Sequence, residues 1–360
     1  MAPAVVEEIA APGFGALGWL VRDTALHKTA LCGMRLSAGL TLEELSLNAS
    51  TQTKKLLFTG VPCDGAKAGM VLTEKTRADL HGAFIAFGHA ISEHVRGGLL
   101  LHRDMGLPYE FICDMNEGAG IPSGRGRTPL PTHEYAAWSI AVSIGAALDG
   151  RGMGWPGCRV AIDGFGEVGS ALAKLAAAKG AKITSISNSR GSIYDDDGLD
   201  AGALAGMREK EGGEFIRRLG PAPSDGIFSK ECDVFVPCAR SLSVTDELAP
   251  RIRAPIIVAG ANAPMLPRTE RALWRKGKTI VPDGVSNCGG VLLGWLKHFA
   301  KENDEERIGL RLRGRVEELL SCGEPPSDFL AALFRRRLAA LRGGKSPTEG
   351  SPDSLLPPLS

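Results

Sequence analysis

A glycine-rich turn between an apolar run and a helical pattern constrains the fold of this chain more than any other feature. The segment 159–163 is short and largely apolar, and it leads directly into Gly164, Gly166 and Gly169. An Ala- and Leu-rich stretch follows, and a second apolar run begins at residue 182. A glycine triplet that joins a strand to a helix is a much stronger signal than the same triplet alone.

The spacing of these glycines predicts a unit that binds a dinucleotide. The first glycine permits a tight turn, the second lets a pyrophosphate approach the backbone, and the third lets the helix pack on the strand. Free N–H groups at the start of the helix then hold the phosphates. An ordinary glycine turn is the alternative interpretation. The residues expected to contact the cofactor here are Gly164, Phe165, Gly166, Glu167, Val168 and Gly169.

Length and charge fit two globular domains and exclude several other classes of protein. The chain has 360 residues, enough for two domains of about 100–200 residues each. Its 42 basic and 41 acidic residues leave a net charge of +1, which indicates no nucleic-acid or membrane partner. No run approaches the roughly 18 apolar residues of a transmembrane helix, and no signal peptide is apparent. The eight cysteines are scattered without a CxxC pair, so we expect reduced thiols, no metal site and a cytoplasmic protein.

Three more short apolar runs follow the glycine unit and extend the predicted sheet. They lie at 232–237, 256–262 and 279–283, and helical patterns separate them. This alternation predicts further parallel strands in one doubly wound α/β sheet. Asn262 lies at the end of the second of these runs, and Asn287 follows the third. Because ligand contacts gather at the carboxyl ends of the strands in open α/β sheets, both amides are candidate binding residues.

The N-terminal third predicts a second α/β domain with two candidate polar groups. Thr41 and Glu44 have the spacing of a capping box, so a helix should run from 42 to about 57. Lys67 lies in what reads as a turn of small residues, where desolvation would favour its neutral form. Asp104 ends a predicted strand, where a carboxylate is well placed for acid–base work. Local sequence alone favours an ordinary surface or turn residue in both cases.

With these motifs in order, residues 19 to 300 resemble the glutamate/leucine/phenylalanine/valine dehydrogenase family. Lys55 and Lys67 match two lysines of that family, and Asp104 falls where its catalytic aspartate is expected. The order of the motifs is specific enough to overturn the local interpretations of Lys67 and Asp104. The six motifs that carry the resemblance are 23–35, 53–55, 65–67, 103–106, 260–262 and 281–290.

The resemblance implies a fold and a reaction. Residues 1–128 would form a substrate domain and residues 129–289 a Rossmann-type dinucleotide domain, with the active site in the cleft between them. Residues 290–343 would pack back on the substrate domain, and residues 344–360 would form a disordered tail. The reaction would be the reversible NAD(P)-dependent oxidative deamination of an L-amino acid to the 2-oxo acid and ammonia, carried out by a homo-oligomer.

The resemblance also implies a role for each matched residue. Lys67 would activate the attacking water, and Asp104 would carry a proton to and from nitrogen. Lys55 and the backbone of Gly33 would hold the α-carboxylate of the substrate. The residues that would fix the nicotinamide and the substrate are Thr132, Ala261, Asn262 and Asn287.

Two positions bear on the side chain of the substrate. Leu31 occupies the place of the lysine that pairs with the side-chain carboxylate of glutamate, and Gly294 falls where the glutamate branch tends to have serine. Since a buried carboxylate without a partner is costly, an apolar side chain is favoured. Glutamate dehydrogenase remains an alternative, because residues 187–191 and 198–200 look more like that branch.

Four departures keep a second alternative open, a catalytically silent dinucleotide-binding protein with a regulatory role. Asp64 is the most consequential departure, since its negative charge near Lys67 would work against that lysine as a base. The residues that differ from the family pattern are Cys32, Asp64, Ala66 and Cys288.

The end of the second strand bears on the choice between NAD and NADP. In NAD-specific sites an acidic residue about 20 residues past the glycines accepts hydrogen bonds from the ribose hydroxyl. Asn188 stands there instead, and the nearby Arg190 is able to pair with a 2′-phosphate. The sequence therefore leans slightly towards NADP. In the alternative interpretation Arg190 points to solvent, Asn188 caps the turn, and both cofactors are used.

Overall fold

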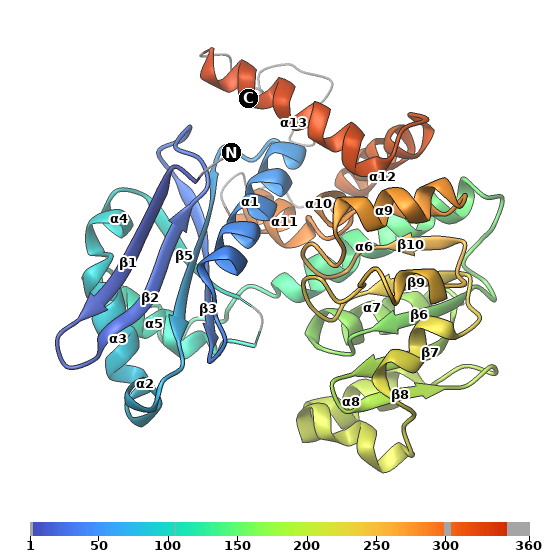
Figure 1. The fold of residues 1–360 in the computed structure, drawn as a ribbon, viewed down its shortest axis with the longest axis horizontal. Helices are drawn as coiled ribbons and strands as arrows, with labels where there is room; N and C mark the ends of the chain where they lie inside the picture. Colours follow the sequence, from blue (N-terminus) through green and yellow to red (C-terminus); the bar gives the residue numbers. More distant parts are fainter. Residues whose placement is uncertain (1–2, 105, 299–303, 344–360) are drawn as a thin grey trace. The chain divides into compact units, whose positions relative to one another are not determined.

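The computed structural model describes residues 3–104, 106–298 and 304–343, and its ribbon is drawn in Figure 1. Backbone contacts divide this part of the chain into two compact units. The first comprises residues 3–130 with 338–343, and the second comprises residues 131–337. The predicted disordered tail, 344–360, lies outside the described residues.

A mixed five-stranded sheet forms the centre of the first unit. Its strand order is β1-β2-β4-β3-β5. β3 is parallel to β4 and β5, whereas β2 is antiparallel to both β1 and β4. The strands are β1 (Val5–Ala11), β2 (Gly15–Arg22), β3 (Ala30–Ser37), β4 (Asp64–Val71) and β5 (Leu99–Arg103).

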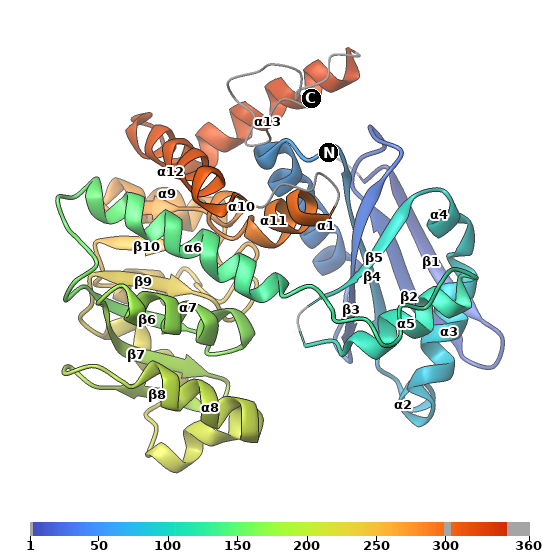
Figure 2. The same cartoon turned by 180° about the vertical axis from the view of Figure 1, so that it is seen from behind.

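Helices cover both faces of this sheet. Figure 1 shows α1 (Leu42–Thr59) in front of the strands, and Figure 2 shows α3 (Leu80–Ala90) and α5 (Tyr109–Gly118) in front of the opposite face. Alternate residues of a strand point to opposite faces, so Val21 packs with α1 while Leu20 joins the core beneath α3 and α5. Two short helices complete the unit, α2 (Glu74–Ala78) and α4 (Ser92–Arg96).

Small residues on β4 let α1 lie directly against this strand. A Cβ atom at Gly65 would lie 2.4 Å from the backbone nitrogen of Thr53, so no larger residue fits. The prediction of a turn around Lys67 was wrong: the segment Asp64–Val71 is one continuous strand. The small residues that suggested a turn serve the close packing of helix on strand.

The second unit contains a doubly wound sheet, which confirms the predicted α/β fold class. Its strand order is β11-β10-β9-β6-β7-β8, and all pairs are parallel except β7 with β8. After β6, the chain adds β7 and β8 on one side. It then crosses to the other side of β6, where β9, β10 and β11 follow in turn. The strands are β6 (Arg159–Asp163), β7 (Lys182–Asn188), β8 (Gly191–Tyr194), β9 (Val234–Pro237), β10 (Ile256–Val258) and β11 (Thr279–Val281).

Helix α6 (Thr132–Asp149) is the main packing partner among the helices of this unit. It contacts α7 (Glu167–Ala178), α11 (Gly289–His298) and α12 (Glu305–Ser321). Figure 2 shows α6 and α7 over one face of the sheet. The remaining helices are α8 (Ala201–Glu211), α9 (Pro267–Arg275), α10 (Asp283–Ser286) and α13 (Pro326–Arg342), with short 3₁₀ turns η1 (Gly212–Leu219), η2 (Ser224–Ser229) and η3 (Ala249–Arg251).

Residues 290–343 were expected to pack on the substrate domain, and the structure groups most of them differently. α11 and α12 belong to the second unit, where apolar residues such as Leu296 and Leu312 are buried. Only 338–343 cluster with the first unit among the described residues. In the described ranges, no helix has the length and apolar character needed to cross a membrane.

Candidate active site

Lys67 lies at the centre of a polar cluster on the α1 face of the first sheet. Its side chain is only 3% exposed, and its Nζ lies 3.2 Å from Oδ2 of Asp104. Nε of Arg35 reaches the same oxygen, also at 3.2 Å. Lys67 comes from β4, Arg35 from β3, and Asp104 directly follows β5, so three neighbouring strands bring the charges together.

Gly33 makes room for this cluster. A Cβ atom at Gly33 would lie 2.5 Å from Nζ of Lys67 and 3.0 Å from Cε1 of His102. The lysine amine and the histidine ring therefore converge over the backbone of β3. The structure thus places three predicted site residues side by side: Gly33, Lys67 and Asp104.

His102 is a residue of this cluster that sequence reasoning missed. Burial, together with the positive charge of Lys67, lowers the pKa of His102 to about 4, so its ring is neutral near pH 7. Nδ1 lies 3.0 Å from the carbonyl oxygen of Arg103, which assigns the proton to Nδ1 and leaves Nε2 as an acceptor. The period of two along a strand was the available signal, because it places His102 on the same face as Asp104.

Two further predicted residues belong to the same unit. Lys55 is 6% exposed in α1, and its charge also contributes to lowering the pKa of His102, so its amine is within electrostatic range. Leu31 is half-buried on β3 and shares a strand face with Gly33. Gly294 is buried in α11 of the second unit.

Asp64 does not oppose Lys67 in the way the sequence suggested. Its carboxylate is bound by Arg22, by the hydroxyl of Thr24 at 2.8 Å, and by the backbone N–H groups of Leu26 and His27. Burial alone would raise the pKa of Asp64, but hydrogen bonds from His27, Arg22 and Thr24 outweigh it, and the pKa is lowered. Asp64 differs from the family pattern, and its hydrogen bonds hold the segment between β2 and β3 against β4.

The glycine turn of the second unit has the geometry of a phosphate site. Gly164 has a φ of +105°, and a Cβ at Gly169 would lie 2.1 Å from the carbonyl oxygen of Gly164. At Gly166 a Cβ would meet no described atom within 4 Å, so the backbone there is open to a ligand. α7 begins directly afterwards without a side-chain hydrogen bond at its cap. Its first N–H groups therefore fit a pyrophosphate.

The surroundings of Asn287 also suit a nicotinamide cofactor. Its side chain is 94% buried, and Nδ2 donates to the carbonyl of Gly260 at 3.0 Å and to Oδ1 of Asn262 at 3.3 Å. Its Oδ1 is buried without a hydrogen-bond partner in the described part of the chain. A carboxamide N–H₂ is the kind of donor that would satisfy this acceptor. Ala261, whose N–H donates to Pro237, lies beside them, and Thr132 is the first residue of α6.

The β7–β8 turn holds the two residues that bear on cofactor choice. Oδ1 of Asn188 accepts from the N–H of Arg190 at 2.8 Å, so Asn188 caps the turn. The guanidinium of Arg190 is paired, with Nε 2.6 Å from Glu214. The positive charge on which the lean towards NADP depended is therefore compensated in this structure.

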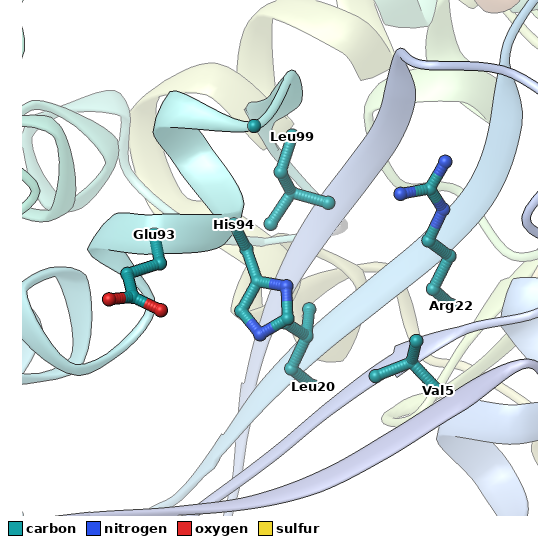
Figure 3. Close-up of a pocket in the computed structure, with 7 residues that line it drawn as sticks. Val5, Leu20, Arg22, Glu93, His94 and Leu99 are labelled. Carbon is teal, nitrogen blue, oxygen red and sulfur yellow. The ribbon is translucent and has the colours of Figure 1, made fainter.

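A cavity of about 240 Å³ lies elsewhere in the first unit, as Figure 3 shows. Its wall includes Leu20 and Arg22, which share the strand face opposite to that of Lys67. Both basic side chains that reach it already have carboxylate partners: Arg22 binds Asp64, and His94 lies 2.7 Å from Glu7. This cavity is separate from the Lys67 cluster. Among the described residues, no group of three or more His, Cys, Asp or Glu side chains could hold a metal ion.

A doubly wound sheet with a glycine turn after β6, beside the point where the strand order reverses, defines a dinucleotide-binding protein. Comparison with known proteins makes the class specific. The family described as Glutamate/Leucine/Phenylalanine/Valine dehydrogenase matches residues 130–320. The chain belongs to this family, and it is an NAD(P)-dependent amino-acid dehydrogenase.

Individual relatives agree with this assignment. The NAD-specific glutamate dehydrogenase of Staphylococcus aureus (strain COL) is 33% identical over 308 residues, covering 79% of this chain and 73% of that protein. The glutamate dehydrogenase of Aeropyrum pernix is 37% identical over 296 residues, covering 77% and 70%. The Leu-bound hetero-hexameric glutamate dehydrogenase of Thermus thermophilus shares the fold, with a TM-score of 0.74, 24% identity and coverage of 95% and 85%.

Proposed function

We propose that the Lys67 cluster carries out the reversible oxidative deamination of an L-amino acid to the 2-oxo acid and ammonia. The observation that supports this most directly is the contact of Lys67 with Asp104 at 3.2 Å, where a buried amine and a carboxylate converge beside Gly33. Such a pair provides one group to take a proton and another to return it. Lys55 and the backbone of Gly33 are proposed to hold the α-carboxylate.

The proposed chemistry assigns proton transfers to both groups. The Asp104 carboxylate first takes a proton from the ammonium group of the substrate, which leaves a neutral amine. Bound NAD(P)⁺ would supply the acceptor for the hydride of Cα, whose loss leaves an iminium on the substrate. Neutral Lys67 takes a proton from water as the water oxygen adds to the iminium carbon. Asp104 then returns its proton to the nitrogen, which leaves as ammonia, while the new hydroxyl group releases its proton to solvent as the carbonyl forms. In the reverse direction the same groups exchange their protons in the opposite order.

An apolar substrate side chain is the first candidate, and glutamate is the second. Leu31 is half-buried on the face of β3 that carries Gly33, and it offers no charge to a side-chain carboxylate. Gly294 provides no polar side chain either. The names of the relatives, glutamate dehydrogenases of Staphylococcus aureus and Aeropyrum pernix, favour glutamate instead.

The cofactor is proposed to bind the second unit through residues 164–169, with Asn262, Asn287, Ala261 and Thr132 around the nicotinamide. The lean towards NADP has no support, because Arg190 is engaged by Glu214 and a 33% identical relative is named NAD-specific. We expect NAD to be used at least as well as NADP. A homo-oligomeric, cytoplasmic enzyme remains a prediction.

One experiment tests the activity and both substrate candidates. The purified chain is given L-leucine, L-valine, L-phenylalanine or L-glutamate at equal concentration with NAD or NADP, and reduced-nicotinamide absorbance is followed. We expect the three apolar amino acids to be oxidised faster than glutamate. A clear preference for glutamate selects the second candidate, and the absence of any amino-acid-dependent reduction, with cofactor still bound, indicates a silent protein.

A further inference from the structure

Arg35 contacts Asp104 although the proposed reaction gives it no task. It follows Gly33 by two residues on β3, so both residues face α1. Its side chain is only 11% exposed, and Nε lies 3.2 Å from Oδ2 of Asp104. The other side of the guanidinium pairs with Glu44.

Glu44 is itself held in place by the start of α1. Its backbone N–H donates to Oγ1 of Thr41 at 3.1 Å, as the predicted capping box requires. Its side chain turns to Arg35 instead of closing the box. Opposite charges therefore alternate along a chain of contacts from Glu44 through Arg35 and Asp104 to Lys67.

The two cations on Oδ2 of Asp104 differ in their chemistry. A guanidinium stays protonated at every pH at which proteins remain folded, whereas a lysine amine can lose its proton. Under the proposed function, Lys67 must be neutral to take a proton from water. At that moment Lys67 no longer attracts Asp104 as an ion, and Arg35 keeps the carboxylate in position.

Arg35 also shares the charge of Asp104. A carboxylate with only one cationic neighbour would hold Lys67 in its ammonium form, which is the wrong form for a base. Arg35, a second and permanent cation beside Asp104, weakens the preference of Lys67 for its ammonium form. Glu44 has the opposite effect, because its negative charge offsets part of the positive charge that Arg35 presents to Asp104.

We propose that Arg35 is a positioning residue, which orients Asp104 and lets Lys67 become neutral, with Glu44 setting the strength of this effect. The proposal depends on the proposed function of Lys67 and Asp104. The titratable and charged groups facing these residues are Lys67 from β4, His102 from β5, and Glu44 and Lys55 from α1. The buried thiol of Cys32 on β3 lies on the opposite face of the sheet, within electrostatic range of Lys67 and Asp104.

The test compares Arg35→Met, Arg35→Lys and Glu44→Gln with the unchanged chain, using kcat, KM and the pH–rate profile. Arg35→Met should lower kcat about 10- to 100-fold, the cost of a misplaced group. It should move the acid limb of the profile, along which Lys67 becomes neutral, about one pH unit upwards, because Lys67 loses a nearby like charge that favours its neutral form. Arg35→Lys should bring the limb back towards its original position. Glu44→Gln should move it downwards.

A matched control is Arg96→Met, which removes an exposed arginine of α4 in the same unit and should leave the profile unchanged. A purely structural Arg35 would change the melting temperature without moving the pH limb, and that result overturns the inference. If Arg35→Met does not fold, Glu44→Gln decides: a downward shift supports the inference and an unmoved limb overturns it.

Failure of the proposed function would look different. Lys67→Ala and Asp104→Asn would then keep substantial turnover, and both proposals would fall together. If those two variants are inactive while Arg35→Met keeps the original profile, only the inference about Arg35 is wrong.

Discussion

Arg190 and Glu214 form an ion pair at the turn between β7 and β8, with Nε of the arginine 2.6 Å from Oε1 of the glutamate. Glu214 comes from η1 and also binds Arg217 at 3.0 Å. A carboxylate from a later segment therefore supplies negative charge where the strand end itself has only Asn188. A cofactor whose ribose binds at this turn, as proposed, would therefore meet a carboxylate that disfavours a 2′-phosphate.

Glu214→Gln should improve the use of NADP. The substitution releases Arg190 from its carboxylate and removes a negative charge near the ribose position predicted for the cofactor. We expect the KM for NADP to fall about two- to five-fold relative to that for NAD, the range for an exposed ion pair. Glu211→Gln, which disturbs only the neighbouring pair with Arg218, is the control. Equal cofactor ratios in both variants would refute this account.

Lys67→Ala should abolish turnover while cofactor binding persists. The amine is buried beside Asp104, whereas the glycine turn belongs to the second unit, so the two functions should separate. Turnover is measured by absorbance and cofactor binding by fluorescence titration. Lys75→Ala, at an exposed lysine of α2, is the control and should remain active. Substantial turnover of Lys67→Ala would show that another group acts as the base.

Asp104→Asn should lower kcat by about 10²- to 10⁴-fold, the usual contribution of a general acid or base. Asparagine keeps the size of the side chain but cannot exchange the proton. Circular dichroism and melting temperature should show that the fold persists. A near-normal rate would place the proton shuttle on a different residue.

Asp64→Asn should destabilise the first unit by about 3 kcal/mol, because Arg22 loses its charged partner at a side chain only 1% exposed. The pKa of Asp64 is lowered in the folded chain, so its stabilising effect is present above the ordinary carboxyl pKa. The effect is lost as the pH falls through the lowered value. The difference in melting temperature between the two proteins should therefore narrow below about pH 4.

The matched control for Asp64 is Asp225→Asn, which breaks an exposed pair with Arg251. Its effect on the melting temperature should be close to zero, because an exposed ion pair contributes little to stability. An equal fall in melting temperature in the two variants would mean that burial does not strengthen the contacts of Asp64.

Glu270→Gln should stabilise the second unit at alkaline pH. Burial, and then the charges of Asp283 and Asp328, raise the pKa of Glu270 to about 7. An acid with a raised pKa costs stability as the pH rises from its unfolded value of about 4.5 to that folded value. Glutamine can still accept from the N–H of Ser327, so melting temperature should rise at pH 8 and change little at pH 4. An unchanged melting temperature at pH 8 would contradict the raised pKa.

Local patterns were enough to predict the elements of the dinucleotide unit. β6, the glycine turn, α7 and β7 are consecutive, and each one is specified by residues within its own segment. Helix α1 begins at Leu42 after its predicted cap, Thr41, for the same reason. The resemblance of motifs supplied Lys67 and Asp104, which spacing alone left as surface or turn residues.

The contacts around the candidate site could not be predicted in the same way. Arg35, Glu44 and Asp104 meet only because the parallel strands and α1 bring distant segments together. Asp64 looked like a neighbour of Lys67 in sequence, but three residues along a strand is an odd number, so the two side chains point to opposite faces. β8 escaped notice because Gly191–Tyr194 is too short to show a period.

The bonds of Asp64 have a consequence for the register of β4. Lys67 lies opposite Gly33 on β3 and Val21 on β2. A slip of one residue would place Ala66 or Ala68 over Gly33 and drive the amine of Lys67 into the apolar core around Met34. Strands made of glycine and alanine resist such slippage poorly, because their faces are nearly alike. Asp64, the first residue of β4, accepts hydrogen bonds from Arg22, Leu26 and His27. These bonds oppose the alternative alignments and so keep the side chain of Lys67 at the proposed reaction centre.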